Sequence, residues 1–331
     1  DGVYNHDKCI MYDIKDDKLQ PMFEKIRIHG HAETIFGRDV LLVYDKYNSE
    51  GLRCWRVGED GTILGTTPLP TSSIKITAVL DEGDLICCTG YYHGDNEPKV
   101  LRLDSEGNVI WSVPVNGYGF WITPVVHNGF IFLHTRCDET EDDGALFKLD
   151  LCGKIVARKP LPGIKNHSEF IFIDGLIYYL GDYYGQKSIQ EVFIKMDESL
   201  ECIESITLPK EISIYSKAVL DRKAKVAYYN ALDNIIVAID MKSMEYRAEK
   251  LDSQISLHAA DGNGFIYGST IGSTVYVLDT EMKIQSKHRL KGDVYDVCQT
   301  SKGMFAVTGS RWSGWGAPEN CLVRVYRIEH I

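Results

Sequence analysis

The chain has 331 residues, a formal net charge of −11 and a sequence pI of about 5.4. Its 44% hydrophobic and 25% charged residues are typical of a folded globular protein. The acidic balance disfavours nucleic acid or an anionic membrane surface as a partner, because both attract basic surfaces. No run of 18 apolar residues occurs, so the sequence predicts no membrane-spanning helix.

The cysteines and the first residues bear on the compartment. The nine cysteines include no CxxC pair, and Cys54, Cys88, Cys202 and Cys321 fall inside predicted strands. This usage predicts buried thiols and favours a reducing compartment such as the cytoplasm. The sequence begins with Asp1-Gly2 and no initiator methionine, as expected of a mature form or of one domain in a longer chain.

A strand–turn–strand pattern recurs along the chain, and its clearest copy is VLRLDSEGNVIWSVPV at 100–115. Further copies begin at Cys9, Cys54, Ala145, Val192, Ile235 and Thr274. The first strand of each copy ends at Asp13, Gly58, Asp104, Asp150, Asp197, Asp240 or Asp279, with spacings of 39–47 residues. A period in this range indicates a repeat architecture. Aspartate suits the turn because its side chain accepts hydrogen bonds from nearby backbone N–H groups.

A second hairpin lies between these copies. Its segments are TIFGRDVLLVYD, AVLDEGDLICCTG, PVVHNGFIFLHTR, FIFIDGLIYYLGD, AVLDRKAKVAYYN, AADGNGFIYGST and CQTSKGMFAVTGS. If the strands of this hairpin are named A and B, and those of the aspartate hairpin C and D, each unit has four antiparallel strands. This count predicts an all-β chain forming a single seven-bladed β-propeller over residues 1–331.

The predicted blades cover approximately residues 31–70, 71–117, 118–163, 164–210, 211–253, 254–292, and 293–331 together with 8–28. In the last blade, an N-terminal strand around Leu19 would join the C-terminal strands as strand D and close the ring, which hides an open sheet edge. The segment Cys9–Ile14 is then left over. It either adds a fifth outer strand or competes with the C-terminal strand.

The aspartate hairpin resembles the quinoprotein-like (PQQ-like) propeller repeats, which share a strand ending in Asp, a turn containing Gly, and a following Trp. Only Trp111 occupies the Trp position, and the other units have Leu64, Val156, Ile203, Tyr246 and Gln285 there. The resemblance implies the propeller fold, with Trp111 packed between blades. Because the ring of tryptophans found in quinone-binding members is missing, no cofactor is predicted. WD repeats fit less well, since no Gly-His and Trp-Asp pairs recur.

The loops of the predicted blades are asymmetric. The A–B and C–D turns are short and polar, whereas several B–C and D–A loops are long, irregular and rich in aromatic residues. Loops carry function more often than the repeats that support them, and exposed rings give contact area at low entropic cost. The predicted ligand-binding residues are Tyr91, Tyr92, Trp121, His167, Tyr183, Tyr184, Tyr215, Tyr295, Trp312 and Trp315. The alternative is that these rings pad the loops against one another.

Other constellations carry weaker signals. Histidines 29, 31, 93, 134 and 167 fall on the same predicted face and could converge on a transition metal, although ordinary loop histidines explain them better, so no metal is predicted. The acidic run 138–143 lacks the spacing of a calcium loop, and Cys137 lacks a recognisable base. Gly262-Asn263-Gly264 is interpreted as an A–B turn. No phosphate loop, nucleophile elbow or zinc-protease motif occurs.

Taken together, these patterns predict a non-catalytic binding or scaffold module that uses the B–C/D–A face. The expected ligand is a protein or peptide first and a carbohydrate second. The alternative is a propeller enzyme, such as a glycan lyase or hydrolase, with a site at the central channel and a metal held by histidines. The residues that begin the predicted A strands are His31, Lys75, Trp121, His167, Tyr215, Ser256 and Tyr295, and they show no repeated catalytic type.

Overall fold

The computed structural model of the 331-residue chain describes eighteen stretches of residues. They are 3–5, 8–15, 18–26, 32–36, 41–45, 53–57, 63–70, 74–80, 83–89, 99–115, 124–135, 144–161, 164–166, 170–184, 189–270, 272–300, 303–309 and 324–328. The chain divides into two compact units. Unit 1 comprises Asp1–Tyr12, Pro21–Ile189 and Met196–Ile203, and unit 2 comprises Asp13–Gln20, Gln190–Lys195 and Glu204–Ile331.

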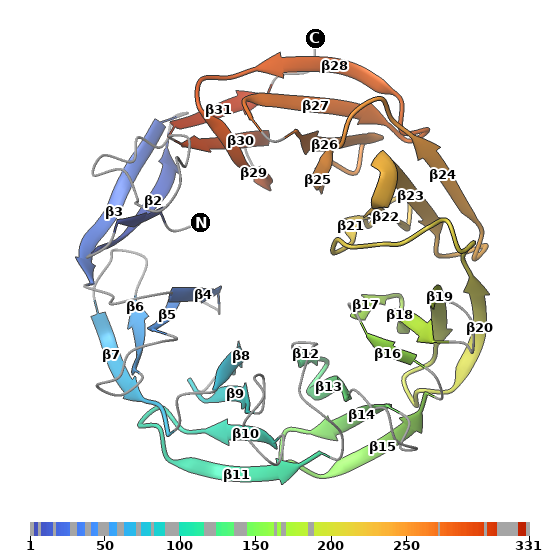
Figure 1. The fold of residues 1–331 in the computed structure, drawn as a ribbon. Coiled ribbons are helices and arrows are strands. Elements are labelled where there is room, and N and C mark those ends of the chain that lie inside the picture. Colours follow the sequence, from blue (N-terminus) through green and yellow to red (C-terminus); the bar gives the residue numbers. More distant parts are fainter. Residues whose placement is uncertain are drawn as a thin grey trace. The chain divides into compact units, whose positions relative to one another are not determined.

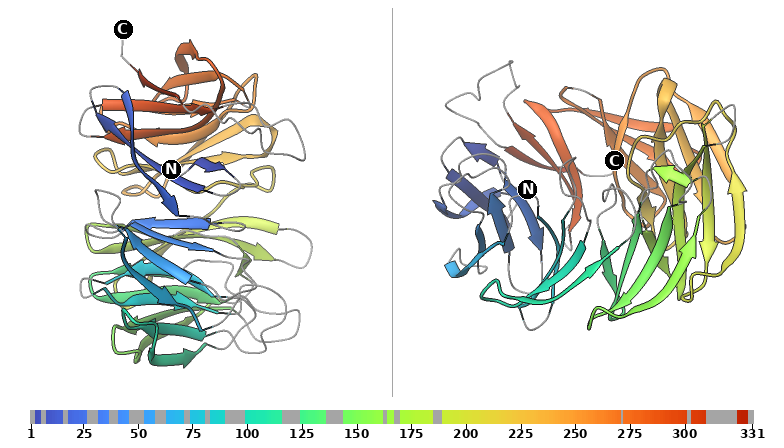
Figure 2. Two further views of the ribbon diagram at one scale, coloured as in Figure 1. Left: turned by 90° about the vertical axis from the view of Figure 1, so that its left-hand side faces the viewer. Right: turned by 60° about the horizontal axis from the view of Figure 1, so that its bottom comes forward.

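Five of the described sheets contain four antiparallel strands whose order in space follows their order in the chain (Figure 1). In unit 1 they are β4 (Ala32–Phe36), β5 (Leu41–Asp45), β6 (Arg53–Val57) and β7 (Ile63–Pro68); β8 (Lys75–Val79), β9 (Leu85–Cys88), β10 (Lys99–Leu103) and β11 (Val109–Pro114); and β12 (Val125–His127), β13 (Phe130–Thr135), β14 (Ala145–Asp150) and β15 (Ile155–Pro160). In unit 2 they are β21 (Val219–Asp221), β22 (Val226–Ala231), β23 (Ile235–Asp240) and β24 (Tyr246–Lys250); and β25 (Ser256–Ala260), β26 (Phe265–Ser269), β27 (Thr274–Asp279) and β28 (Ile284–Arg289). These sheets confirm the predicted four-stranded repeat, and Figure 2 shows their twist.

The sheet of the fourth predicted blade has five strands. Its strand order is β16 (Ile164–Asn166), β18 (Leu176–Tyr184), β19 (Ile189–Met196) and β20 (Cys202–Thr207), and β17 (Phe170–Ile173) also pairs with β18. The innermost strand is therefore split into two short pieces. Within the described residues, the only helix is the short 3₁₀ turn η1 (Leu232–Asn234) between β22 and β23.

The two ends of the chain form three-stranded sheets. β2 (Lys8–Lys15) pairs with both β1 (Val3–Asn5) and β3 (Lys18–Ile26), and β29 (Asp293–Thr300), β30 (Gly303–Gly309) and β31 (Arg324–Ile328) form the other sheet. The segment Cys9–Ile14 thus lies between two N-terminal neighbours, a place that the sequence did not predict. Pairing of the segment around Leu19 with the C-terminal strands is not among the described pairings, and the seven-blade count stays a prediction.

The core lies between the faces of consecutive sheets within each unit. The second and third strands are buried along almost their whole length, as in β14 and β22, whereas the fourth strands β11, β15, β20 and β24 are largely exposed. One hydrophobic cluster joins Ile86 and Val100 to Leu133 and Phe147 of the next sheet. Burial therefore follows strand position, because an outer strand has a neighbour on one edge only.

The aspartate turns have the predicted geometry. Asp104 Oδ1 accepts hydrogen bonds from the backbone N–H groups of Glu106 (2.8 Å) and Asn108 (2.9 Å). Equivalent pairs of bonds are made by Asp150, Asp197 and Asp279, whereas Asp240 accepts from the N–H groups of Lys242 and Ser243, two and three residues further on. The pKa values of Asp104 and Asp197 lie below the usual range for aspartate, chiefly because the side chains of Asn108 and Ser199 donate hydrogen bonds to these carboxylates, and the backbone N–H bonds add to the effect.

A residue with a positive φ follows each turn aspartate from Asp104 to Asp279. It is the third residue after the aspartate in four turns, namely Gly107 (φ 90°), Gly153 (φ 85°), Leu200 and Met282, and the fourth in the Asp240 turn, Met244. A Cβ on Gly153 would lie 2.8 Å from Trp111 Cδ2, and one on Gly107 would lie 2.2 Å from the carbonyl oxygen of Pro68. Glycine is required there for space as well as for φ, whereas the buried Leu and Met side chains accept backbone strain and fill the corresponding space.

Trp111 packs between sheets, as predicted: its Nε1 donates to the carbonyl oxygen of Leu151 in the next sheet at 2.9 Å. The residues assigned to the same repeat position were wrong by one. Trp111 pairs with Arg102, which lies two residues before the turn aspartate on the third strand. The residues that pair with the equivalent third-strand position in other sheets are Gly65, Ala157, Arg247 and Ser286, rather than Leu64, Val156, Tyr246 and Gln285. A slip of one residue moves a side chain to the opposite face of a strand. The absence of a repeated tryptophan is unaffected.

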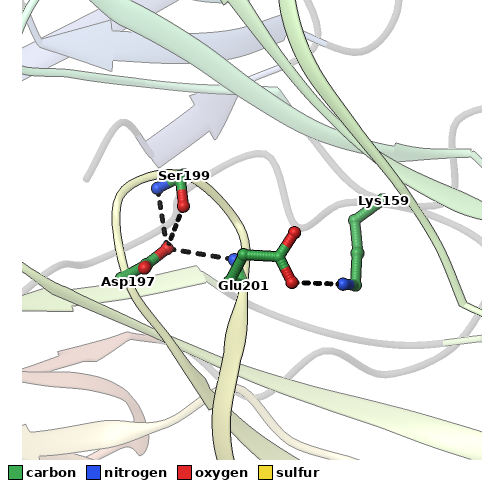
Figure 3. Close-up of polar contacts among 4 residues, drawn as sticks. All are labelled: Lys159, Asp197, Ser199 and Glu201. Carbon is green, nitrogen blue, oxygen red and sulfur yellow. Dashed lines mark hydrogen bonds and ion pairs between the residues drawn. The ribbon is translucent and has the colours of Figure 1, made fainter.

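A recurring bond links consecutive sheets within each unit. A side chain donates to the carbonyl oxygen of the residue just after the turn aspartate of the next sheet. The pairs are Thr67 to Ser105 (2.7 Å), Arg102 to Leu151 (3.0 Å), Lys148 to Glu198 (2.7 Å) and Arg247 to Thr280 (3.2 Å). Figure 3 shows a related contact, in which Lys159 Nζ binds Glu201 of the Asp197 turn at 2.6 Å. The short turns therefore serve as docking points of the scaffold.

The cysteines partly follow the prediction. Cys54, Cys87, Cys88, Cys152 and Cys202 form no disulfide, and the first three of them are buried. Cys202, which was expected to be buried, is exposed because β20 is an outer strand. Cys321 lies outside the described residues.

Candidate functional site

The ten predicted ligand-binding residues are only partly described. Tyr91, Tyr92, Trp121, His167, Trp312 and Trp315 lie outside the described residues. Tyr184 lies in β18 and Tyr295 in β29. Tyr183 and Tyr215 have described side chains, and both are exposed: Tyr183 lies near the end of β18, and Tyr215 lies in the D–A loop between β20 and β21. They belong to different units, so each is considered separately.

Tyr215 is the centre of a small platform in unit 2. Its side chain is 43% exposed, and its hydroxyl oxygen accepts a hydrogen bond from Gln254 Nε2 at 2.9 Å. Its backbone N–H donates to the carbonyl oxygen of Asn230 at 3.1 Å. The ring is thus held at both ends while much of it remains accessible to solvent.

Asn230 fixes the platform from below. It is 4% exposed and lies near the end of β22. Its Nδ2 donates to the carbonyl oxygen of Ile255, and its Oδ1 accepts from the backbone N–H of Leu257 at 2.8 Å. Its own N–H donates to Ser216 Oγ at 2.7 Å. One buried residue therefore joins two segments: the backbone of Asn230 bonds the segment that carries Tyr215, and its side-chain amide bonds the segment that carries Gln254.

Leu232 extends the platform on the side of η1. It is 54% exposed, and its N–H donates to the carbonyl oxygen of Ser213 at 2.9 Å, two residues before Tyr215. The next two residues, Asp233 and Asn234, have φ values of 58° and 63°. Asp and Asn tolerate this left-handed conformation better than other non-glycine residues, so the tight turn presents Leu232 to solvent.

Glu191 supports the same segment from β19. It is buried, and its Oε1 accepts a hydrogen bond from the backbone N–H of Ile214 at 2.9 Å. Ile214 also forms an isolated β-bridge with Ala231. Residues 213–216 are therefore bound to both β19 and β22, and the platform formed by Tyr215, Leu232 and Gln254 is rigid before any ligand arrives.

His134 is the chemically notable group at the loop-bearing end of β13 in unit 1. It is buried, its ring meets that of Tyr179 edge-on at 5.5 Å, and its Nε2 has no hydrogen-bond partner among the described residues. Burial lowers its pKa from 6.5 to about 3, so the imidazole is neutral at neutral pH.

Most of the residues considered as metal ligands lie outside the described part of the chain, so the structure does not test these hypotheses. His29, His31, His93 and His167, the acidic run 138–143 and Cys137 lie outside it. Among the residues that the structure describes, no three His, Cys, Asp or Glu side chains gather in a group that could hold a metal ion.

The hairpin of β25 and β26 carries a polar pair at its loop-bearing end and a predicted turn at its other end. His258 lies at an irregularity in the pairing of β25 with β26, and its Nε2 is 2.8 Å from Ser269 Oγ. Sequence reasoning missed this pair because the two residues belong to different strands. At the opposite end of the same hairpin, Gly262-Asn263-Gly264 forms the predicted turn, in which Asp261 accepts from the N–H of Asn263 at 2.8 Å.

The turn end of unit 1 contains a cavity that is too small for a ligand. It measures about 10 Å³, which leaves room for about one water molecule. Phe130, Phe132 and Phe172 line it. Lys148 Nζ lies 4.1 Å from the centre of the Phe130 ring and is already bonded to the carbonyl oxygen of Glu198. This end of the sheets is consistent with the predicted structural turns.

No known protein family matches the sequence, and no curated protein matches it. Solved structures do. Sqt1 of Saccharomyces cerevisiae matches with a TM-score of 0.65 and 10% identity over 98% of this chain and 91% of its own. BamB of Moraxella catarrhalis matches with a TM-score of 0.63 and 14% identity over 90% and 93%. BBS1N, solved in complex with ARL6DN, matches with a TM-score of 0.51 and 13% identity over 84% and 87%.

The fold is a β-propeller. Sqt1 and BamB are propeller proteins, and the repeated four-stranded sheets of this chain agree with them. At these levels of identity the likeness concerns the fold alone. No helix in the described part of the chain has the length and apolar character needed to cross a membrane.

Proposed function

We propose that this propeller is a non-catalytic binding module that recognises a protein or peptide on the face that carries the B–C and D–A loops. The observation that carries the proposal is the platform of Tyr215, Leu232 and Gln254. The accessible ring of Tyr215 and the accessible aliphatic side chain of Leu232 lie on two segments that are joined by backbone hydrogen bonds next to the buried Asn230. A surface that is ordered before binding loses little entropy when the ligand arrives.

The composition of the platform favours a peptide over a carbohydrate. Leu232 offers contact area but no hydrogen bond, which suits an apolar side chain better than a sugar hydroxyl. Gln254 can still bond a ligand's backbone, because its amide oxygen is not used in the contact with Tyr215. The propeller neighbour BBS1N was solved as a complex with another protein. Tyr183 is proposed as a further contact on unit 1, and the channel-enzyme alternative stays a prediction.

The test is a selection of binders from a random peptide library displayed on phage, followed by calorimetric titration of the best peptide. Tyr215→Ala and Leu232→Ser should each weaken binding about 10-fold or more, as expected of central aromatic and aliphatic contacts. The matched control is Tyr246→Ala, because Tyr246 is a tyrosine of the same unit that is 37% exposed but lies on the outer strand β24.

Binding that survives both platform substitutions, or that is lost in Tyr246→Ala, would show that the platform is not the recognition surface. A parallel glycan array decides between ligand classes. Glycan binding that depends on Tyr215, without peptide binding, would replace the peptide by a carbohydrate.

A further inference from the structure

The outer strand β11 has an unusual apolar edge. It has the sequence VIWSVP and is the last strand of its sheet, so one row of its backbone N–H and C=O groups has no neighbouring strand within the sheet. Val109 is 48% exposed and Ile110 is 50% exposed. An exposed, apolar strand edge of this kind is a template for pairing with another strand.

Four other outer strands of the repeat carry charged residues, which β11 lacks. Charged residues occur in β15 (Arg158 and Lys159), β20 (Glu204), β24 (Arg247, Glu249 and Lys250) and β28 (Lys287 and Arg289). Charges on an outer strand oppose pairing with a second sheet, because pairing would bury them. Ser112 of β11 and Arg158 of β15 occupy equivalent positions, opposite Leu101 and Phe147 of their sheets. β7 is also uncharged, but it contains Gly65 and two threonines, which lower its apolar area.

We propose that β11 pairs in antiparallel fashion with β11 of a second copy of this chain, forming a two-fold symmetric dimer. The charges of the sheet favour this occupant. The turn at the start of β11 carries Asp104 and Glu106, whereas Lys99 lies opposite Pro114 at its end. An antiparallel pair of identical strands brings the acidic end of each copy toward the basic end of the other. A two-fold interface needs only one self-complementary surface, which this strand supplies.

The pairing should be short and weak. Pro114 lacks an N–H group and ends the row of hydrogen bonds, which leaves about four residues on each strand for the interface. An interface of this size lies below the usual range for stable complexes, so the dimer should be weak and should form only at micromolar or higher protein concentrations.

Sedimentation equilibrium between about 1 and 300 µM tests the proposal. The wild-type protein should change from monomer to dimer over this range. Ile110→Lys and Ser112→Arg should remain monomeric, since each places a charge in the paired strand, and the second copies the arrangement of β15. Val156→Lys is the matched control, because Val156 is also 50% exposed and lies on an outer strand that already carries two charges.

A wild-type protein that is monomeric at every concentration would overturn the proposal. So would a dimer that persists in both β11 variants, or one that is lost equally in Val156→Lys. Circular dichroism spectra identical to wild type establish that each variant is folded. These results are independent of the peptide platform, because β11 and Tyr215 belong to different units and the peptide titration does not depend on dimerisation.

Discussion

Replacing Asn230 with alanine separates the buried support of the platform from its exposed surface. The substitution leaves the backbone bonds to Tyr215 and Ser216 in place but removes both side-chain bonds. The carbonyl oxygen of Ile255 and the N–H of Leu257 then lose their partners beside a side chain that is only 4% exposed.

The magnitude follows from these two groups. A buried polar group left without a partner costs about 1–3 kcal/mol, so two of them predict a loss of about 2–6 kcal/mol in the free energy of unfolding. Asn108→Ala is the control, because it removes an asparagine side-chain hydrogen bond that is exposed to solvent. Asn108 Nδ2 donates to Asp104 Oδ2 at 2.9 Å on the surface, where water replaces the lost bond and the cost should stay below about 1 kcal/mol.

Urea unfolding monitored by fluorescence measures both free energies, and hydrogen exchange gives a local signal. The Leu257 amide should exchange faster in Asn230→Ala, because its acceptor is the deleted Oδ1. Affinity for a selected peptide should also fall, because β22, to which the segment carrying Tyr215 is bonded, loses its side-chain link to residues 255–257. Equal unfolding free energies in the two variants, with the Leu257 amide still protected, would refute this account of Asn230.

Two further substitutions test the core. His134 has a folded pKa of about 3, below its unfolded value near 6.5, so its stabilising contribution is complete above pH 6.5 and is lost as pH falls toward 3. Over this interval the wild type should lose up to about 1.4 kcal/mol of unfolding free energy per pH unit relative to His134→Phe. Urea titrations at several pH values measure this difference, and parallel pH profiles of the two proteins would contradict it. Gly153→Ala should destabilise the fold by more than about 2 kcal/mol, because the new Cβ meets Trp111 and the positive φ adds a backbone penalty. Gly175→Ala is the control: its φ is 73° and no atom lies within 4 Å of the new Cβ, so it should cost only about 1 kcal/mol. Equal melting temperatures of the two variants would show that Trp111 moves freely aside.

The repeat was predictable because its signals are local. Each turn aspartate bonds backbone groups two to four residues away, so the turn can be recognised within a short window of sequence. The one-residue error around Trp111 has the same origin. The strands joined by these turns carry register irregularities, as between Arg102 and Leu103, and such an irregularity shifts the alternation of faces without changing the composition.

Exposure of the outer strands was less predictable. Cys202 and Ile203 have the composition of a buried strand, yet they are exposed because β20 has a neighbour on one side only. Whether a strand is second or fourth in its sheet depends on pairing over the whole unit. Apolar composition therefore indicates a strand but not its depth.

The candidate site shows where local reasoning ends. Tyr215 was predicted from its residue type and its place in a loop, but Asn230 lies within an otherwise apolar strand and carries no motif. Its role comes from segments 14–27 residues away in the sequence, which meet at this one residue only after the sheets have formed. A buried asparagine near the end of a strand must find partners for its amide, and the nearest segments are those that lead into the loops. In a repeat fold, isolated polar residues at the loop-bearing ends of inner strands are therefore a better guide to an ordered binding surface than the aromatic residues alone.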